Sequence, residues 1–238
     1  MGPQTLALKG RRVLVTAGPT YEDIDPVRYI GNRSSGRMGF AVARAAAEAG
    51  ARVSLISGPV QLDTPYGVDR SNVRSAREMR AAVMKQVAGA DVFIGVAAVA
   101  DYAPAEASEH KIKKGRSNQT LELVANPDII AEVATLAERP LTVGFAAETE
   151  NLEANAREKL SRKRLDMIAA NKVGQPGSGF EADTNEIVLF SDRGKKSLGT
   201  GSKQELARLL ISEVAARLNG KECIETGSDK NTRSAPGN

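Results

Sequence analysis

The apolar positions of the chain form short runs and longer periodic stretches that alternate from end to end. Runs typical of buried strands occupy residues 11–18, 52–59, 91–100, 141–148, 166–171 and 185–191. Patterns typical of helices occupy residues 36–50, 76–88, 127–136, 151–165 and 203–218. Strands that alternate with helices of this length are typical of βαβ units. The pattern therefore predicts a single domain with a Rossmann-like, doubly wound α/β fold, in which helices cover both faces of a mainly parallel sheet.

Short motifs mark the starts of several predicted helices. Ser75 and Glu78 have the spacing of a capping box, in which the serine and the glutamate satisfy backbone N–H groups of the first turn. Ser202 and Glu205 have the same spacing before the last predicted helix. Pro127 occupies a favoured first helical position. These motifs support helix starts at all three places.

Composition places the chain among ordinary globular proteins. Its 238 residues are enough for one sizeable core, and hydrophobic residues make up 41% of them. Residues 1–220 are expected to fold, whereas the polar, aperiodic residues 221–238 are expected to be a disordered tail. No apolar run is long enough to span a membrane, and no secretory leader opens the sequence. With Cys223 as the sole cysteine, we expect a reducing, cytoplasmic location.

Other residue counts narrow the chemistry. His110 is the single histidine, which argues against a histidine-based zinc site and against a Ser-His-Asp triad. The net charge of +4 suits an anionic ligand but does not single out nucleic acid. Tryptophan is absent and aromatic residues make up only 4%, which argues against a surface that stacks bases. We therefore expect small anionic molecules as partners, with no nucleic acid and no membrane.

In a doubly wound sheet the ligand binds outside the carboxyl ends of the strands. One segment in that position is "YIGNRSSGRMGF", residues 29–40, in which Ser34 and Gly36 fall at the start of a predicted helix. Such a terminus offers N–H groups and the positive end of the helix dipole to an anion. Gly36 and Gly39 would let the backbone approach that anion closely. From the residues alone, a phosphate site and a plain turn with tight helix–strand packing are equally supported.

Two familiar nucleotide motifs do not fit this loop. The second predicted strand ends "LISGPV", without the acidic residue that binds a nicotinamide cofactor's ribose, and no Tyr-x-x-x-Lys pair is present. The stretch "SSGRMG" also lacks the Gly-Lys-Ser/Thr ending of a P-loop. An NAD(P)-binding Rossmann oxidoreductase nevertheless stays as the alternative function.

Two groups of basic residues are candidates for contact with phosphate. The stretch "HKIKKGR", residues 110–116, is either a solvated basic loop, a flap that carries lysines to a polyphosphate, or a nucleic-acid patch. The residues alone favour the solvated loop. Lys159 and Lys163 lie one helical turn apart and so share a face, which the residues alone also assign to solvent.

Five stretches together resemble one family. In order they are "AGPTYEDIDPVRYIGNRSSGRMG", "AAVADY", "KIKK", "NPDI" and "GFAAET". They are similar to phosphopantothenate–cysteine ligases of the bacterial type, usually the C-terminal half of a bifunctional coenzyme A biosynthesis protein. The resemblance runs from about Arg12 to about Leu218. It implies a ligase that joins 4′-phosphopantothenate to L-cysteine with CTP and Mg²⁺. The reaction passes through an acyl-cytidylate and releases pyrophosphate and then CMP.

The resemblance also implies roles for individual residues. Asn32 would serve the acyl-cytidylate, and Lys111, on a flap around residues 103–118, would help to form it. Arg28 is a candidate to reach the site of the second subunit of a homodimer, and Ala97 and Ala98 would line the phosphopantothenate site. Nucleotide contacts would come from Gly18, Ser34, Gly36, Gly39, Asp101, Lys111, Pro127, Asp128, Ile129, Ile130, Phe145, Lys159 and Lys163. The metal ligands are not indicated.

The resemblance has a consequence for the length of the protein. The flavin-dependent decarboxylase half that usually precedes this ligase is absent from the sequence. The chain is therefore expected to be either a stand-alone ligase or a domain of a longer protein that carries that half.

Overall fold

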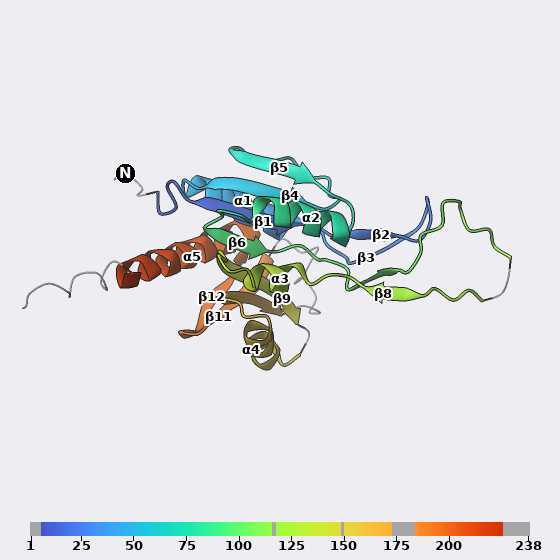
Figure 1. Cartoon of the computed structure of the whole chain (residues 1–238). Coiled ribbons are helices and arrows are strands. Elements are labelled where there is room, and N and C mark those ends of the chain that lie inside the picture. Colours follow the sequence, from blue (N-terminus) through green and yellow to red (C-terminus); the bar gives the residue numbers. More distant parts are fainter. Residues whose placement is uncertain (1–5, 116–117, 149, 173–183, 226–238) are drawn as a thin grey trace, which may run out of the picture.

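The computed structural model describes residues 6–115, 118–148, 150–172 and 184–225. Its centre is an eight-stranded sheet in the order β12-β11-β10-β9-β6-β1-β4-β5 (Figure 1). The strands are β1 (Arg12–Ala17), β4 (Arg52–Ser57), β5 (Val68–Asn72), β6 (Val92–Gly95), β9 (Leu141–Glu148), β10 (Met167–Lys172), β11 (Thr184–Ser191) and β12 (Gly194–Ser202).

Six neighbouring strands of the sheet are parallel, from β10 to β5, and the β11–β12 hairpin adds an antiparallel edge. The strand order reverses at β1, because β4 and β5 lie to one side of it and β6, β9 and β10 to the other. A reversal of this kind opens a crevice at the carboxyl ends of the strands, where ligands bind in such folds.

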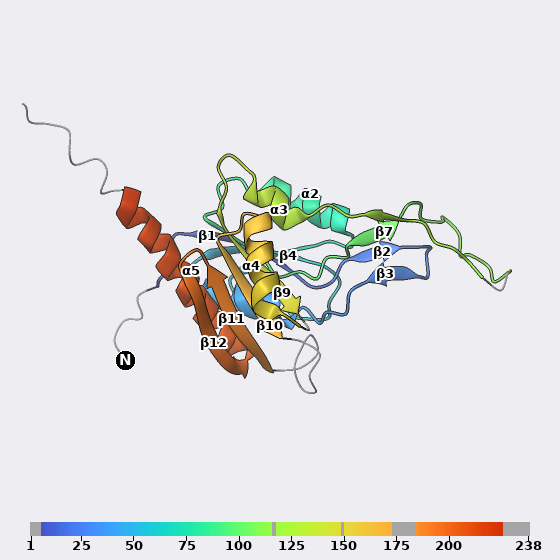
Figure 2. The same ribbon diagram turned by 90° about the horizontal axis from the view of Figure 1, so that it is seen from below.

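Helices cover both faces of the sheet (Figure 2). The helices are α1 (Arg37–Glu48), α2 (Ala76–Gln86), α3 (Ile129–Ala134), α4 (Leu152–Arg162) and α5 (Lys203–Glu225). Successive strand residues point to opposite faces. Val13 and Val15 therefore pack with α1 and α5, whereas Leu14 packs with α2 and α3. Both faces are apolar, which explains the near-continuous apolar runs in the sequence. The predicted fold is confirmed.

Of the two predicted capping boxes, the one at α5 is complete and the one at α2 is present in part. The Glu78 N–H donates to Ser75 Oγ (3.2 Å), although the Glu78 carboxylate accepts from the Arg74 N–H (2.7 Å) rather than from that of Ser75. At α5, the Glu205 N–H donates to Ser202 Oγ (3.2 Å), and the Ser202 N–H donates to the Glu205 carboxylate (3.0 Å). Each helix start is thus fixed by its own side chains.

Several predicted boundaries differ from the structure, including those of β6, α3 and α5. β6 ends at Gly95, not at residue 100, because its neighbour β1 has ended and only an isolated bridge between Pro19 and Ala98 follows. α3 starts after Pro127, since the Asp128 side chain caps it by accepting the Ala131 N–H (3.3 Å). α5 extends to Glu225, past the predicted end of the fold, and residues 226–238 lie outside the described residues.

A projecting arm was not predicted as regular structure. Its described residues are 21–31, 102–115 and 118–125, and they contain two short antiparallel pairs: β2 (Tyr21–Asp23) with β3 (Tyr29–Gly31), and β7 (Tyr102–Pro104) with β8 (Leu123–Ala125). The pairs lie side by side and extend from one end of the body (Figures 1 and 2). The predicted flap at residues 103–118 lies within this arm, mostly in the long β7–β8 connection.

Candidate active site

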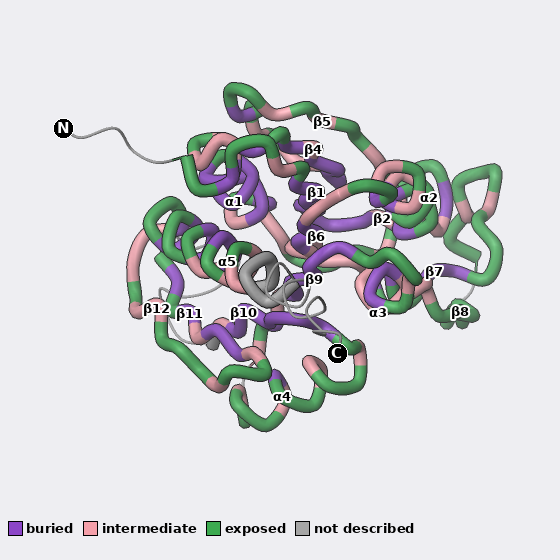
Figure 3. Tube along the Cα trace, turned by 60° about the vertical axis from the view of Figure 1, so that its left-hand side comes forward, coloured by how far each residue is buried: buried purple, intermediate pink, exposed green. Residues whose placement is uncertain are grey.

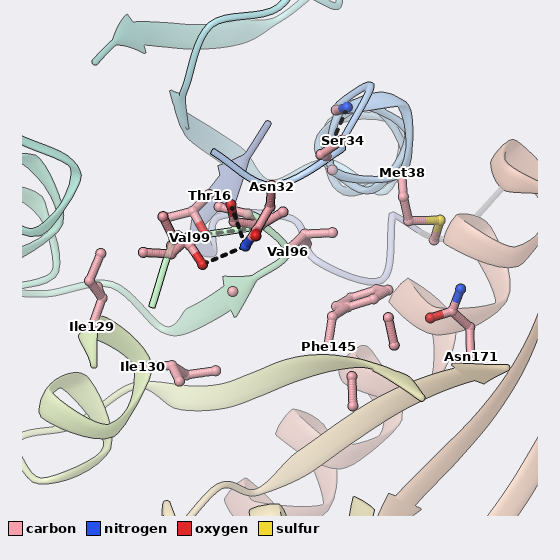
Figure 4. A pocket seen from close by; sticks show the side chains of 18 of the residues that line it. Thr16, Asn32, Ser34, Met38, Val96, Val99, Ile129, Ile130, Phe145 and Asn171 are labelled. Atoms are coloured by element: carbon pink, nitrogen blue, oxygen red, sulfur yellow. Dashed lines mark hydrogen bonds between the residues drawn. The ribbon is translucent and has the colours of Figure 1, made fainter. Parts of the chain in front are cut away.

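A cavity of about 730 Å³ lies at the carboxyl ends of the strands, beside the point where the strand order reverses (Figure 4). Thr16 at the end of β1 and Gly95 at the end of β6 contribute to it, as does the chain that leaves β6. The start of α1, the start of α3 and Phe145 of β9 form further walls. The predicted ligand position in the fold therefore contains a cavity.

Most of the residues predicted for the site line this cavity. They are Asn32, Ser34, Gly36, Gly39, Ala97, Ala98, Asp101, Pro127, Asp128, Ile129, Ile130, Phe145, Lys159 and Lys163. Gly18, Arg28 and Lys111 are not among the lining residues. Gly18 packs directly behind the loop, because a Cβ on Gly36 would lie 3.4 Å from the Gly18 Cα. Arg28 and Lys111 lie in the arm.

The start of α1 has the conformation that an anion site needs. Gly36 is the N-cap and has a φ of 73°, in the left-handed region that glycine adopts without strain. Its N–H lies 3.3 Å from Ser34 Oγ, and no side chain caps the helix. The first turn of α1 therefore keeps backbone N–H groups at the cavity, where they suit a negatively charged ligand.

Gly39 has a packing role. A Cβ at this position would lie 2.5 Å from the Ala17 Cβ, closer than side chains approach. The residue is buried on the face of α1 that contacts β1. Tight helix–strand packing therefore explains glycine at position 39, and the left-handed turn explains glycine at position 36.

Asn32 is fixed to the loop that follows β6. Its Nδ2 donates to the Val99 carbonyl (2.9 Å) and lies 3.5 Å from that of Ala98 (Figure 4). The same loop is held from β1, because Thr16 Oγ1 accepts the Ala97 N–H (3.4 Å). The contact with Ala98 is at the limit of hydrogen bonding, so the second N–H of the Asn32 amide is the one that a ligand would meet.

The two predicted lysines of α4 face the cavity rather than solvent. Lys159 forms an ion pair with Glu148 (2.5 Å), and Lys163 forms one with Asp128 (2.9 Å). The assignment of these lysines to a solvated face was wrong, because carboxylates at the end of β9 and the start of α3 draw them inward. Ile130 packs against two glycines, Gly95 and Gly144. A Cβ on either glycine would lie about 3 Å from the Ile130 Cδ1.

Further residues that were not predicted for the site also line the cavity. They are Arg33, Arg37, Asn171, Asn185 and Lys203. Asn171 is the last residue but one of β10, Asn185 is the second residue of β11 and Lys203 begins α5, so each lies at the same edge of the sheet as the predicted residues. Polar residues at the ends of apolar runs were the available signal. Asn185 and Lys203 are each 6% exposed, and Asn185 Oδ1 has no hydrogen-bond partner among the described residues.

The cavity is positively charged. Its described lining contains five cationic side chains, Arg33, Arg37, Lys159, Lys163 and Lys203, against two acidic ones, Asp101 and Asp128. The helix starts add the positive ends of their dipoles. This excess of positive charge suits a ligand with several negative charges, such as a polyphosphate.

At the tip of the arm, a buried carboxylate joins two segments. Asp25 Oδ1 accepts the N–H groups of Val27 and Arg28 (both 2.9 Å), and Oδ2 accepts the N–H of Ile112 (3.1 Å). The Arg28 guanidinium also donates to Oδ2, through Nε (3.0 Å) and Nη2, and Nη2 donates to the Ile112 carbonyl (2.9 Å). The guanidinium and then these backbone donors hold the pKa of Asp25 well below its usual range. We call this group, Asp25, Arg28 and Ile112, the Asp25 clamp.

At its base, the arm is attached to the body by an exposed group. Arg74 donates to Asp23 through Nε (2.9 Å) and Nη2 (2.6 Å), and lies over the stacked rings of Tyr21 and Tyr29. The Arg74 hydrogen bonds lower the pKa of Asp23. Glu22, which is buried, accepts the Ala76 N–H (2.9 Å) at the start of α2.

The described residues contain no group of three or more His, Cys, Asp or Glu side chains placed to hold a metal ion. None of the helices in the described part of the chain is long and apolar enough to cross a membrane.

Fold and cavity together define a class: a Rossmann-like α/β domain with a cationic ligand site where the strand order reverses. The family model described as "DNA/pantothenate metabolism flavoprotein C-terminal domain" matches residues 8–218. The chain belongs to this family.

Similar proteins and a similar solved structure support the same assignment. The chain is 58% identical over 207 residues to the coenzyme A biosynthesis bifunctional protein CoaBC of Vibrio cholerae, covering 86% of this chain and 52% of that protein. It is 51% identical over 218 residues to CoaBC of Escherichia coli K12, covering 90% and 54%. A crystal structure of the C-terminal domain of CoaBC superposes with a TM-score of 0.77 at 38% identity, covering 90% of this chain and 98% of that one. The chain thus spans about half the length of the curated relatives it matches.

Proposed function

We propose that this chain is a phosphopantothenate–cysteine ligase, which joins 4′-phosphopantothenate and L-cysteine with CTP. The carboxylate oxygen of phosphopantothenate attacks the α-phosphorus, and the bond to the leaving pyrophosphate breaks. The cysteine amine then attacks the acyl carbon of the acyl-cytidylate, loses a proton, and displaces CMP. The observation that carries the proposal is the convergence of four of the five resembling motifs, all but "KIKK", on one cationic cavity in a member of this family.

The walls of the cavity suit different parts of these substrates. A carboxylate that attacks a phosphate meets like charge, so cations and helix N–H groups must offset it. The start of α1, with Ser34 and Gly36, suits the phosphates of the nucleotide. The start of α3, where Ile129 and Ile130 are apolar, suits the base. The loop at Ala97 and Ala98, held by Asn32, suits phosphopantothenate.

The residues present also fit Mg²⁺, which is expected to arrive with the triphosphate. Mg²⁺ is commonly bound by one or two carboxylates together with substrate phosphates, so no all-protein cluster is needed. Asp128 caps α3 and pairs with Lys163, whereas Asp101 is exposed at the cavity, so Asp101 is the better ligand. The ion would offset negative charge on the phosphates.

The arm is the proposed homodimer interface. Arg28 and Lys111 belong to the arm and do not line the cavity of their own chain, so their proposed roles require a second chain that brings an arm to that cavity. Large apolar side chains are exposed on the arm, including Val27 (60%) and Tyr102 (54%). Exposed apolar side chains of this kind commonly mark an interface.

We also propose that the full-length protein is longer than this ligase domain. A flavin-dependent decarboxylase half in the full-length protein is supported by relatives that are named bifunctional and are about twice as long as the match.

The nicotinamide alternative has no specific observation in its favour. Where a nicotinamide site has an acidic residue, β4 ends at the buried Ser57, whose hydroxyl donates to the Gly58 carbonyl (2.8 Å).

Release of pyrophosphate tests the proposal. Phosphopantothenate is supplied with CTP or with ATP, each with and without cysteine. We expect CTP to give about one pyrophosphate per site without cysteine and continued turnover with it. Equal rates with ATP would contradict the choice of nucleotide. If neither CTP nor ATP gives pyrophosphate, the ligase proposal as a whole is contradicted.

A further inference from the structure

The β7–β8 connection carries Lys111 far from the sheet, yet two hydrogen-bonded ties hold the segment around it. The Ser108 N–H donates to the Ile24 carbonyl (2.9 Å), and the Ile112 N–H donates to Asp25 Oδ2 (3.1 Å). Both partners, Ile24 and Asp25, belong to the tip of the β2–β3 hairpin. Lys111 therefore lies between two points where its loop is fixed to another segment.

Asp25 is the centre of this arrangement. Its side chain is fully buried, and its two oxygens have separate tasks. Oδ1 closes the hairpin turn through the N–H groups of Val27 and Arg28, while Oδ2 reaches the other segment at Ile112. Arg28 completes the link, because it donates to the Ile112 carbonyl as well as to Asp25. Both peptide groups of the residue after Lys111 are thus fixed by side chains of the hairpin.

The Asp25 carboxylate and the Lys111 ammonium differ in how their charges are satisfied. The buried Asp25 carboxylate accepts hydrogen bonds from the Arg28 guanidinium and from three backbone N–H groups, so its negative charge is satisfied locally. Lys111 is exposed and makes no ion pair with the described residues. The clamp therefore fixes the backbone of Lys111 without neutralising its ammonium. The Arg28 side chain is 46% exposed, so the clamp also leaves part of this guanidinium accessible.

We propose that Asp25 is a positioning residue, which acts through Arg28 and Ile112 to set Lys111 for the α-phosphate of the nucleotide. This inference rests on the proposed function, in which Lys111 assists the first half-reaction. Asp25 itself contacts no reacting atom. A displacement of about 1 Å of a group that stabilises a transition state can reduce the rate by on the order of a hundredfold. Loss of the hydrogen bond between Asp25 and Ile112, the residue after Lys111, should therefore slow the reaction.

A double-mutant cycle tests whether Asp25 acts through Lys111. Pyrophosphate release without cysteine is measured for wild type, Asp25→Asn, Lys111→Gln and the double variant, with CTP affinity measured in parallel. We expect Asp25→Asn to lower the rate by on the order of tenfold or more and to leave CTP affinity within about twofold. In the Lys111→Gln background the same change should have little further effect, because the group that it positions is gone.

A matched control is available in the same hairpin. Asp23→Asn removes a carboxylate that pairs with Arg74 at the base of the arm, and it should behave alike in both backgrounds. Amide hydrogen exchange shows whether the clamp itself opens: Ile112 should lose protection in Asp25→Asn while the strands of the sheet keep theirs. If Asp25→Asn does not fold, Asp25→Glu is used instead, because it keeps the charge but its extra methylene moves the carboxylate relative to the Ile112 N–H.

Several outcomes would overturn the inference. Equal losses from Asp25→Asn in both backgrounds would show a general structural role, and no loss in either would show no role. Unchanged protection of Ile112 would contradict the geometry of the clamp. Absence of pyrophosphate release by wild type would contradict the proposed function first, and the positioning role with it, whereas active wild type with additive losses would contradict the positioning role alone.

Discussion

The body and the arm hold their residues in place by different means. In the body, the strands that lead to the cavity are buried on both faces, as the mostly purple tube of β1, β4, β6 and β9 in Figure 3 shows. In the arm, most of the chain is exposed or half-buried, and hydrogen bonds from a few polar side chains fix its shape. The cavity is thus supported by packing, and the arm by a small number of polar contacts.

This difference has consequences for stability and for function. Segments with few buried apolar contacts open locally at low free energy, whereas a packed core opens only with the whole domain. A defect in the body should therefore lower the free energy of unfolding. A defect in the arm should lower activity while the domain remains folded. The predictions below separate these two responses.

Lys111→Gln gives the largest expected effect. The change removes the ammonium and keeps most of the side-chain stem, so the arm should fold as before. Pyrophosphate release without cysteine should fall on the order of a hundredfold or more, because one charge stabiliser of the transition state is lost. CTP binding should fall much less, since Lys159, Lys163 and the start of α1 remain at the cavity.

The control for this prediction is the second half-reaction. If Lys111→Gln released pyrophosphate at the wild-type rate and failed only when cysteine was needed, Lys111 would belong to the second step. If neither step changed, the stretch 110–116 would be the solvated basic loop that its residues alone favour.

Gly39→Ala tests the packing of the body. The new Cβ would lie 2.5 Å from the Ala17 Cβ, so α1 must shift away from β1. Overpacking of this kind lowers the free energy of unfolding by about 1–3 kcal/mol. Urea denaturation measures it, with Gly220→Ala in α5 as a control for glycine replacement within a helix, where only the tip of the Arg193 side chain, at 3.4 Å, would lie near the new Cβ. Unchanged stability would show that α1 does not depend on this close contact.

The same contrast decides what the sequence could predict. The sheet of the body was predictable because apolar runs such as 11–18 and 141–148 have the length and composition of buried strands. The strands of the arm are three residues long and include the polar sequence "YED", so no periodicity could develop in them. The edge strands β5 and β12 were missed for a related reason, since their sequences are mostly polar.

The candidate site was predictable to a similar extent. Residues carried by four of the five family motifs converge on the cavity, because three of these motifs lie at the carboxyl ends of β1, β6 and β9 and the fourth, "NPDI", opens α3. Asn185 and Lys203 come from the β11–β12 hairpin and the helix after it, where no motif was recognised; the register brings Asn185 opposite Gly201, just before Lys203. The clamp was beyond prediction, since Asp25 and Ile112 are 87 residues apart and only the three-dimensional fold joins them.

Ser202→Ala gives a smaller effect in the body. The serine caps α5 by accepting the Glu205 N–H, and this cap is lost on replacement by alanine. The expected loss is about 1 kcal/mol in the free energy of unfolding, with pyrophosphate release unchanged within about twofold when assayed well below the midpoint of unfolding. A loss of activity without a loss of stability would contradict the division between body and arm.

Asp23→Asn gives the smallest effect and sets a lower limit for the arm. The Asp23 and Arg74 side chains are 42% and 48% exposed, and exposed ion pairs contribute at most about 1 kcal/mol. Because Arg74 lowers the pKa of Asp23, the pair stabilises the fold above the ordinary carboxyl pKa and loses this contribution as the pH falls through the lowered one. Thermal unfolding of wild type and variant should therefore differ slightly at pH 7 and converge in acid. Pyrophosphate release at pH 7 should agree within about twofold, since the stacked tyrosines and the Glu22 hydrogen bond still attach the arm. A large loss of activity would show that the base of the arm, and not only the Asp25 clamp, determines where Lys111 lies.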